Sequence, residues 1–444
     1  NCEHEYLDLD DPGNWKTFSP YSGASIQLVG NACSPGLYWS DERLGCFTPP
    51  SKNGGGCDMT DKPINIITGN KYFKETDYTS GGPFPLRFRR YYNSLNQDNE
   101  QLGWSYDYLQ HLEISVNVVK AYRADGKELS FYLDGTGLNW QPEFSRREQL
   151  IKLLSGEWEI RSRGFRERYS SNGSLISITS PQGLTHTLNY VGDNVEVSHA
   201  GRKLVLTLNG AGMITALTTP DLRTINYDYV SGSGVPKLIK VNYPTSSISY
   251  LYQDARFPLN ITRIENDQGQ VLSEVTYNAL GRAATSGLAN GAFQSSIAYI
   301  DDENSYRREV TNALGKTAVH HYAFTDVTPA PGERTIFYPS LTRIEGQASA
   351  SCAASDSEYT YDIRGFKDSF TDSEGNITLY QHDARGNEAS RTEAYGTTEE
   401  RTITTEWHAD YALPIKITEP DRVTDFQYDS NGYLLNKTVT ATAP

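Results

Sequence analysis

The sequence has few methionines, no long apolar run and no excess of basic residues. Only 2 of its 444 residues are Met. No stretch of about 18 apolar residues occurs, so we expect no membrane-spanning helix. The formal net charge is −15, which argues against a nucleic-acid partner, because such binding needs a basic face. The densest basic stretches, 87–92 and 161–169, alternate with aromatic residues and are typical of strands.

Several signatures of catalytic and metal sites are also missing. The sequence contains no G-x-S-x-G, H-E-x-x-H or C-x-x-C motif. The segment ALGKT (313–317) lacks the first glycine of a phosphate-binding loop, since that position is Val310. His320 and His321 are adjacent on an expected strand, so they point to opposite faces and do not share a metal. We therefore expect no catalytic, cofactor or metal site.

Three weaker alternatives stay open. Asp8, Asp10 and Asp11 precede a glycine and would suit a calcium ion, although the later ligands of an EF-hand loop are missing. Pairs of carboxylates elsewhere would suit a glycosidase, but most aspartates recur at turns. Cys352 would be a nucleophile only with a histidine beside it.

Cysteine is scarce and unevenly distributed. Four of the five cysteines fall in the first 57 residues, where turns are frequent and apolar residues are few. A segment that cannot build a core is usually stabilised by disulfides, whereas a zinc site would need ligand spacings that are absent. We expect an oxidising compartment, with the protein secreted or at the cell surface. The disulfide candidates, whose pairing stays open, are Cys2, Cys33, Cys46, Cys57 and Cys352, the last being otherwise a free thiol.

Tyrosine, glycine and a recurring motif are abundant instead. Tyr (30) outnumbers Phe (15), and a Tyr-, Thr- and Gly-rich chain favours strands and turns. The pattern of Tyr or His, then a polar residue, and Gly three residues later recurs between residues 169 and 432. The repeat spacing is about 21 residues and is clearest between Tyr361 and His382 and between Trp407 and Tyr428. The five copies are YSSNG (169–173), YNALG (277–281), YDIRG (361–365), HDARG (382–386) and YDSNG (428–432).

This spacing predicts one β-hairpin per repeat. Asp or Asn starts each turn by bonding its own backbone, glycine supplies a positive φ, and tyrosine packs on the neighbouring hairpin. One hairpin is only marginally stable, so the hairpins should stack into one sheet. The expected turn residues are Gly173, Gly281, Asp362, Gly365, Asp383, Gly386, Asp429 and Gly432.

The patterns divide the chain into three parts. Residues 1–57 form the cysteine-rich segment, residues 58–160 alternate like strands without the repeat, and residues 161–444 carry the repeat. The predicted fold is all-β. It consists of a long antiparallel sheet of stacked hairpins, forming a spiralling shell or solenoid, with a short disulfide-containing N-terminal segment.

The segment before the repeats resembles a known family. PINIITGNKYFKETDYTSGGPFPLRFRRYYNS (63–94) with GWSYDY (103–108) is similar to the N-terminal domain of RHS/YD-repeat proteins. The recurring motif resembles their YD repeats, so the resemblance covers about residues 57–440. The matching positions are Thr68–Lys71, Glu75–Asp77, Pro85–Leu86, Arg89, Tyr91–Ser94 and Gly103–Trp104.

The resemblance implies a sheet that spirals into a shell, often around a C-terminal toxin, as in insecticidal toxin complexes. It implies a bacterial, non-enzymatic, extracytoplasmic scaffold that encapsulates or displays part of a secreted polymorphic-toxin system, here without the toxin domain. Expected partners are a downstream shell or toxin segment, a second copy joined head to tail through the C-terminal edge as in a filament, or a surface glycan or protein receptor. A self-assembling fibre or cell-surface adhesin is the alternative, and a carbohydrate-active enzyme is a third.

Overall fold

The computed structural model describes most of the chain, which forms two compact units, 1–49 and 50–444. The described residues are 59–60, 63–96, 102–142, 148–162, 164–232, 235–302, 305–327, 336–346, 355–430 and 432–442, with four short strands in the first unit. In that unit, β1 (His4–Leu7) pairs with β2 (Trp15–Phe18), and β3 (Tyr38–Ser40) pairs with β4 (Gly45–Phe47).

Several sequence predictions fall where the structure describes no side chains. The disulfide candidates Cys2, Cys33, Cys46, Cys57 and Cys352 lie outside the described side chains. Asp8, Asp10 and Asp11 also lie outside them. Both the disulfides and the calcium alternative therefore stay predictions.

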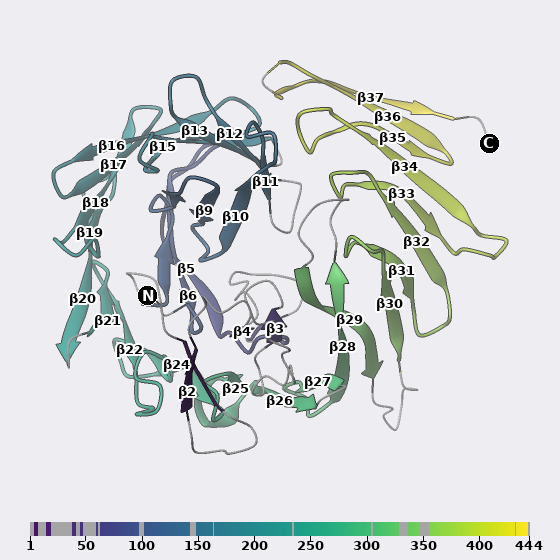
Figure 1. Ribbon diagram of the computed structural model, residues 1–444. Coiled ribbons are helices and arrows are strands. Elements are labelled where there is room, and N and C mark those ends of the chain that lie inside the picture. Colours follow the sequence, from purple (N-terminus) through teal and green to yellow (C-terminus); the bar gives the residue numbers. More distant parts are fainter. Residues whose placement is uncertain are drawn as a thin grey trace. The chain divides into compact units, whose positions relative to one another are not determined.

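A single antiparallel sheet of 30 strands, β8 to β37, dominates the second unit (Figure 1). Each strand pairs with its neighbours in chain order, so the prediction of an all-β fold with one long antiparallel sheet is confirmed. Its first fifteen strands are β8 (His111–Ile114), β9 (Val118–Tyr122), β10 (Glu128–Leu133), β11 (Trp140–Pro142), β12 (Glu148–Lys152), β13 (Trp158–Ser162), β14 (Phe165–Tyr169), β15 (Leu175–Thr179), β16 (Thr185–Val191), β17 (Asn194–His199), β18 (Arg202–Leu208), β19 (Ile214–Thr218), β20 (Thr224–Gly232), β21 (Val235–Asn242) and β22 (Ser247–Leu251).

The second half of the sheet continues in the same order, interrupted by one short 3₁₀ helix, η1 (Ala289–Gly291). Its strands are β23 (Arg263–Asn266), β24 (Val271–Tyr277), β25 (Ala283–Gly287), β26 (Ser295–Asp302), β27 (Ser305–Thr311), β28 (Thr317–Val327), β29 (Ile336–Gly346), β30 (Ser357–Tyr361), β31 (Lys367–Thr371), β32 (Ile377–His382), β33 (Glu388–Glu393), β34 (Arg401–Trp407), β35 (Pro414–Glu419), β36 (Arg422–Tyr428) and β37 (Leu434–Ala441). Across the part of the chain that the structure describes, no helix is long and apolar enough to cross a bilayer.

A small three-stranded sheet packs on one face of the long sheet. It consists of β5 (Tyr72–Thr79), β6 (Arg87–Asn93) and β7 (Trp104–Tyr106), and we call it the docked sheet. Its buried Phe88 and Trp104 share one hydrophobic core with residues of the long sheet from Leu112 to Ile264. The long sheet itself begins at His111 and runs through residue 160 without a break. The predicted boundary near residue 160 stays a prediction.

The recurring motif forms a compact hairpin turn. At Asp362, the backbone N–H donates to the carbonyl oxygen of Phe366 (2.8 Å), and the N–H of Gly365 donates to the carbonyl oxygen of Asp362 (2.9 Å). The Asp362 carboxylate accepts from the N–H groups of Arg364 and Phe366 at 2.9 Å each. This pattern is a tight turn followed by a bulge with a left-handed residue, which explains Asp at the first position and Gly at the fourth.

The glycines of the repeat have the backbone conformation that the sequence predicts. A positive φ is costly for residues with a Cβ and free for glycine, so the prediction of positive φ at these positions is confirmed. The values are +92° at Gly173, +74° at Gly281, +79° at Gly365, +77° at Gly386 and +82° at Gly432.

Tyrosines end equivalent strands and bond the neighbouring strand. Tyr277, Tyr361 and Tyr428 are the last residues of β24, β30 and β36. Each hydroxyl donates to a backbone carbonyl oxygen at the preceding hairpin, at 2.8 Å in all three cases. The acceptors are the carbonyl oxygens of Ile261, Leu341 and Pro414. A phenylalanine would pack equally well but lose these hydrogen bonds, which favours Tyr over Phe at these positions.

Candidate functional site

A buried ion pair fixes the docked sheet to the long sheet. Arg90 of β6 donates through Nε to the Asp77 carboxylate of β5 at 2.7 Å, and neither side chain has exposed surface. Two tyrosine hydroxyls of the long sheet also donate to the Asp77 carboxylate, Tyr227 at 2.7 Å and Tyr243 at 2.6 Å. The Arg90 guanidinium also donates to the hydroxyl of Tyr250 (2.6 Å). Burial opposes the charge on Arg90, but Asp77, Tyr250 and Tyr243 outweigh it, so the pKa of Arg90 is raised.

The family-like segment consists of residues 63–94 and 103–108. Other residues of this segment also attach the docked sheet to the long sheet. The buried Lys71 amine donates to the Ser286 hydroxyl of β25 at 2.9 Å. The Tyr92 hydroxyl donates to the carbonyl oxygen of Leu259 (3.2 Å) and accepts from the N–H of Ile261 (2.9 Å). These polar contacts hold one small sheet in one register on a large one, which apolar packing alone specifies poorly.

Gly69 makes the closest backbone approach in this interface. Its φ is +76°, and a Cβ at this position would lie 2.5 Å from Cβ of Arg282. Its carbonyl oxygen accepts from the N–H of Ala283 at 2.8 Å, beside β25. Only glycine fits both the backbone conformation and this space, which accounts for the T-G-N-K pattern at residues 68–71.

Two arginines of the repeat motif link one turn to the next. Arg364 donates to the carbonyl oxygens of Asp383 (2.8 Å) and His382 (3.2 Å) in the following turn. Arg385 in turn donates to the carbonyl oxygen of Ala409 (2.7 Å). The sequence interpretation used only Asp and Gly of YDIRG and HDARG and missed this role, although the shared arginine was visible in both copies.

Turns from two distant parts of the sheet meet through side chains. The ring of Tyr433, after β36, lies against Gly183, after β15, where a Cβ would be 3.2 Å from the ring. Arg166 of β14 donates to the Tyr433 hydroxyl and lies 5.1 Å from its ring centroid. Arg161 of β13 lies 5.3 Å from the ring centroid of Tyr411. We call these four side chains and Gly183 the seam.

A buried histidine connects the loop before β6 to the long sheet. The His186 ring stacks on Phe84 with centroids 3.9 Å apart, and its Nε2 lies 3.2 Å from the Phe84 carbonyl oxygen. Its Nδ1 lies 3.1 Å from the Tyr108 hydroxyl. Burial lowers the pKa of His186 to about 4, so the ring is neutral at physiological pH.

The remaining sequence candidates have ordinary structural roles. Gly315 of ALGKT has a φ of +73° and closes a repeat-type turn with Asn312, as its N–H donates to the Asn312 carbonyl oxygen at 2.9 Å. His320 and His321 are both in β28, and His321 lies 3.4 Å from Glu345. Within the described residues, no group of three or more His, Cys, Asp or Glu side chains is arranged to hold a metal.

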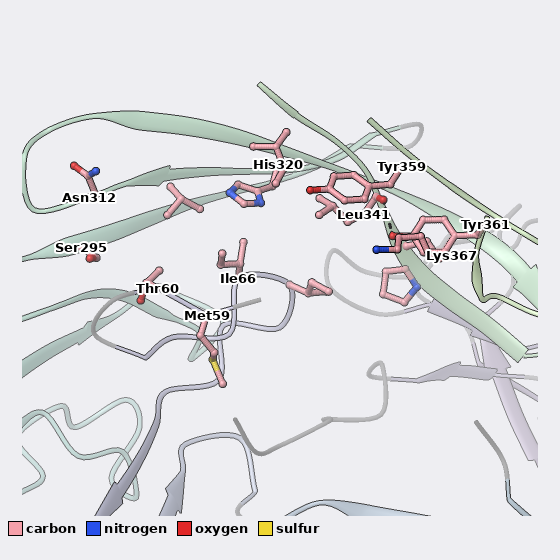
Figure 2. Close-up of a pocket in the computed structure, with 15 residues that line it drawn as sticks. Met59, Thr60, Ile66, Ser295, Asn312, His320, Leu341, Tyr359, Tyr361 and Lys367 are labelled. Atoms are coloured by element: carbon pink, nitrogen blue, oxygen red, sulfur yellow. Dashed lines mark hydrogen bonds between the residues drawn. The ribbon is translucent and has the colours of Figure 1, made fainter. Parts of the chain in front are cut away.

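One cavity of about 700 Å³ lies between the loop before β5 and strands β26 to β31 (Figure 2). Its lining includes Met59, Ile66 and Ile67 from the loop before β5, and His320 of β28 and Lys367 of β31. No carboxylate is among the described lining residues, so these residues do not supply the acid pair of a glycosidase.

Comparisons with known proteins find one family model and a set of distant structures. The model, described as a domain of unknown function (DUF6531), matches residues 61–131, which include the docked sheet, β8, β9 and the first part of β10. No curated protein matches the chain.

The solved structures are similar at low identity. The chain is similar to the crystal structure of TcdB2-TccC3-Cdc42 at 11% identity and a TM-score of 0.30, covering 81% of this chain and 22% of that one. It is similar to TcdB2-TccC3-TEV at 10% identity and a TM-score of 0.32, covering 87% and 22%. The Photorhabdus luminescens Tc holotoxin pore gives 10% identity, a TM-score of 0.26 and coverage of 84% and 23%. The chain thus spans about a fifth of the length of the solved chains it matches.

Proposed function

We propose that this chain is a non-enzymatic RHS/YD-repeat scaffold that forms part of the wall of an extracytoplasmic toxin shell in a bacterium. The observation that carries the proposal is that the family-like segment is anchored to the long repeat sheet. Its anchoring residues, among them Gly69, Lys71, Asp77 and Tyr92, contact the repeat sheet. Residues that attach one sheet to another have a structural role, and this supports a scaffold function.

The polar clusters support a structural role over a catalytic one. The Asp77 carboxylate accepts from Arg90 and from two tyrosines, and Glu159 bonds Arg161 and Arg168. Acid catalysis by a glycosidase needs two carboxylates that face a substrate and hold different protonation states. These carboxylates are instead saturated by structural partners.

The test is the mass and protease sensitivity of the natural protein, captured from its source with an antibody against residues 61–131. A shell component should occur in a polypeptide or complex larger than the 49.6 kDa of this chain. Part of that larger assembly should resist protease until urea opens the wall. A protease-sensitive partner with the wall intact would contradict encapsulation.

A self-assembling fibre or adhesin is the second candidate, favoured by the last strand. All eight residues of β37 are exposed, and among the described strands β37 pairs in register with β36, in a sheet that does not close into a barrel. A free strand edge is a template for another chain. Homopolymers made of the 49.6 kDa chain alone, seen by electron microscopy and lost on deleting residues 433–444, would favour this candidate over the shell.

A further inference from the structure

The cavity beside the loop before β5 has the composition of a binding site. Its walls combine apolar side chains, including Met59, Ile66 and Leu341, with the rings of Tyr359 and Tyr361. Figure 2 shows these side chains around one hollow, with the amine of Lys367 and the ring of His320 at its border. Ligand sites in proteins are typically such concave, mostly apolar spaces with a few polar groups.

Lys367 gives the cavity a positive charge, and none of the described lining residues is acidic. Among the described lining residues Lys367 is the one lysine or arginine, and no carboxylate is present. Its amine lies 4.0 Å from the ring centroid of Tyr380, a contact that holds the amine in place without cancelling its charge. In a chain with net charge −15, a locally positive cavity is a departure that favours an anionic ligand.

His320 adds a polar atom, Nδ1, that has no hydrogen-bond partner among the described residues. Its Nδ1 is buried, and no hydrogen-bond partner lies within reach in the described structure. A buried polar atom without a partner is costly, so its retention beside a cavity is explained by a ligand or water that bonds it. The neutral ring supplies one donor and one acceptor, which suits a carboxylate or a polar substituent next to it.

We propose that this cavity binds a small molecule that has a single carboxylate group on an apolar, aromatic body. Lys367 bonds the carboxylate, the apolar wall and the rings of Tyr359 and Tyr361 cover the body, and His320 bonds a polar atom. The site is independent of the scaffold role, because it uses none of the residues that anchor the docked sheet.

Isothermal titration calorimetry of the 444-residue protein with 4-phenylbutyrate and 4-phenylbutanol tests the proposal. The two probes share the aromatic body and differ in the carboxylate. We expect 4-phenylbutyrate to bind about tenfold more tightly or better, because a charge-assisted bond to Lys367 forms only with the carboxylate. Equal affinity for the two probes, or no binding of either, would overturn the proposal.

Variants assign the effect to this cavity. Lys367→Gln should remove the preference for the carboxylate, Lys367→Arg should keep it, and Lys240→Gln in β21 should leave it unchanged. Lys367 is only partly buried, so these variants should fold, and their melting temperatures check this. A preference that survives Lys367→Gln in the folded protein places the carboxylate elsewhere and refutes the site.

Discussion

The carboxylate of Asp77 and the guanidinium of Arg90 lie 2.7 Å apart with no exposed side-chain surface on either partner. Removing one partner leaves the other charge in the interior, which typically costs about 3–5 kcal/mol. Asp77→Ala should therefore lower the free energy of unfolding by about that amount, as measured by urea denaturation. The matched surface pair is Lys203 with Glu196 at 2.8 Å. Glu196→Ala should lower the free energy of unfolding by about 0–1 kcal/mol. Equal losses in the two variants would contradict a stabilising role for the buried Asp77–Arg90 pair.

Gly386 should tolerate a side chain less well than Gly375. Both have positive φ, +77° and +84°, but a Cβ at Gly386 would lie 2.3 Å from the Phe366 ring, whereas a Cβ at Gly375 meets nothing within 4 Å. Gly375→Ala should cost about 1–2 kcal/mol from backbone strain, as should Gly365→Val. Gly386→Ala should cost a further 1–3 kcal/mol or so from the clash. Thermal denaturation of the three variants decides this, and identical melting temperatures for Gly375→Ala and Gly386→Ala would refute it.

The tyrosine hydroxyl at a strand end should contribute to stability by itself. Tyr361→Phe keeps the ring and removes the bond to the Leu341 carbonyl oxygen, so we expect a loss of about 0.5–1.5 kcal/mol. Tyr395 is 48% exposed, and Tyr395→Phe should change the free energy of unfolding by less than about 0.5 kcal/mol. Urea denaturation measures both, and a neutral Tyr361→Phe would show that the hydroxyl bond adds nothing.

The seam should protect the turn at Gly183 from hydrogen exchange. The N–H of Gly183 donates to Ser180, and the Tyr433 ring covers that turn. Tyr433→Ala should speed exchange of the amides of residues 180–183 while leaving the β24–β25 turn unchanged. Tyr395→Ala serves as the control aromatic deletion. Unchanged exchange at residues 180–183 in Tyr433→Ala would show that the contact does not hold the turn.

Acid should weaken the attachment of the loop before β6. The pKa of His186 is about 4 in the folded chain, because burial opposes the charged ring, and about 6.5 in the unfolded chain. The lowered pKa means that His186 contributes stability above pH 6.5, and that this contribution is lost as the pH falls towards 4. His186→Gln should flatten the pH dependence of the melting temperature over this range. An NMR titration with a His186 pKa of 6.5 or higher would contradict the expectation.

Local chemistry explains why the turns could be predicted from the sequence and the buried Asp77–Arg90 ion pair could not. The turn at Asp362 is closed by bonds within five consecutive residues, so its sequence contains all the information needed. The Asp77–Arg90 pair is completed by Tyr227, Tyr243 and Tyr250, which are more than 130 residues away. Such partners are defined only by how the docked sheet lies on the long sheet.

The start of the sheet and its contacts between turns were also beyond sequence reasoning. Strands β8 to β13 lack the repeat motif yet continue the same ladder, because backbone pairing needs alternation and not a particular motif. Arg364 and Arg385 act on the turn that follows, so their role appears only once neighbouring hairpins are stacked.

The seam gives the second unit one direction in which it is mechanically weak. Along the strand order, neighbours are joined by rows of backbone hydrogen bonds, whereas the described contacts at the seam are side-chain contacts of Arg161, Arg166, Tyr411 and Tyr433. Under an applied load, we expect these side-chain contacts to break before the backbone ladders do. We therefore expect the second unit to open along the seam while every hairpin stays folded.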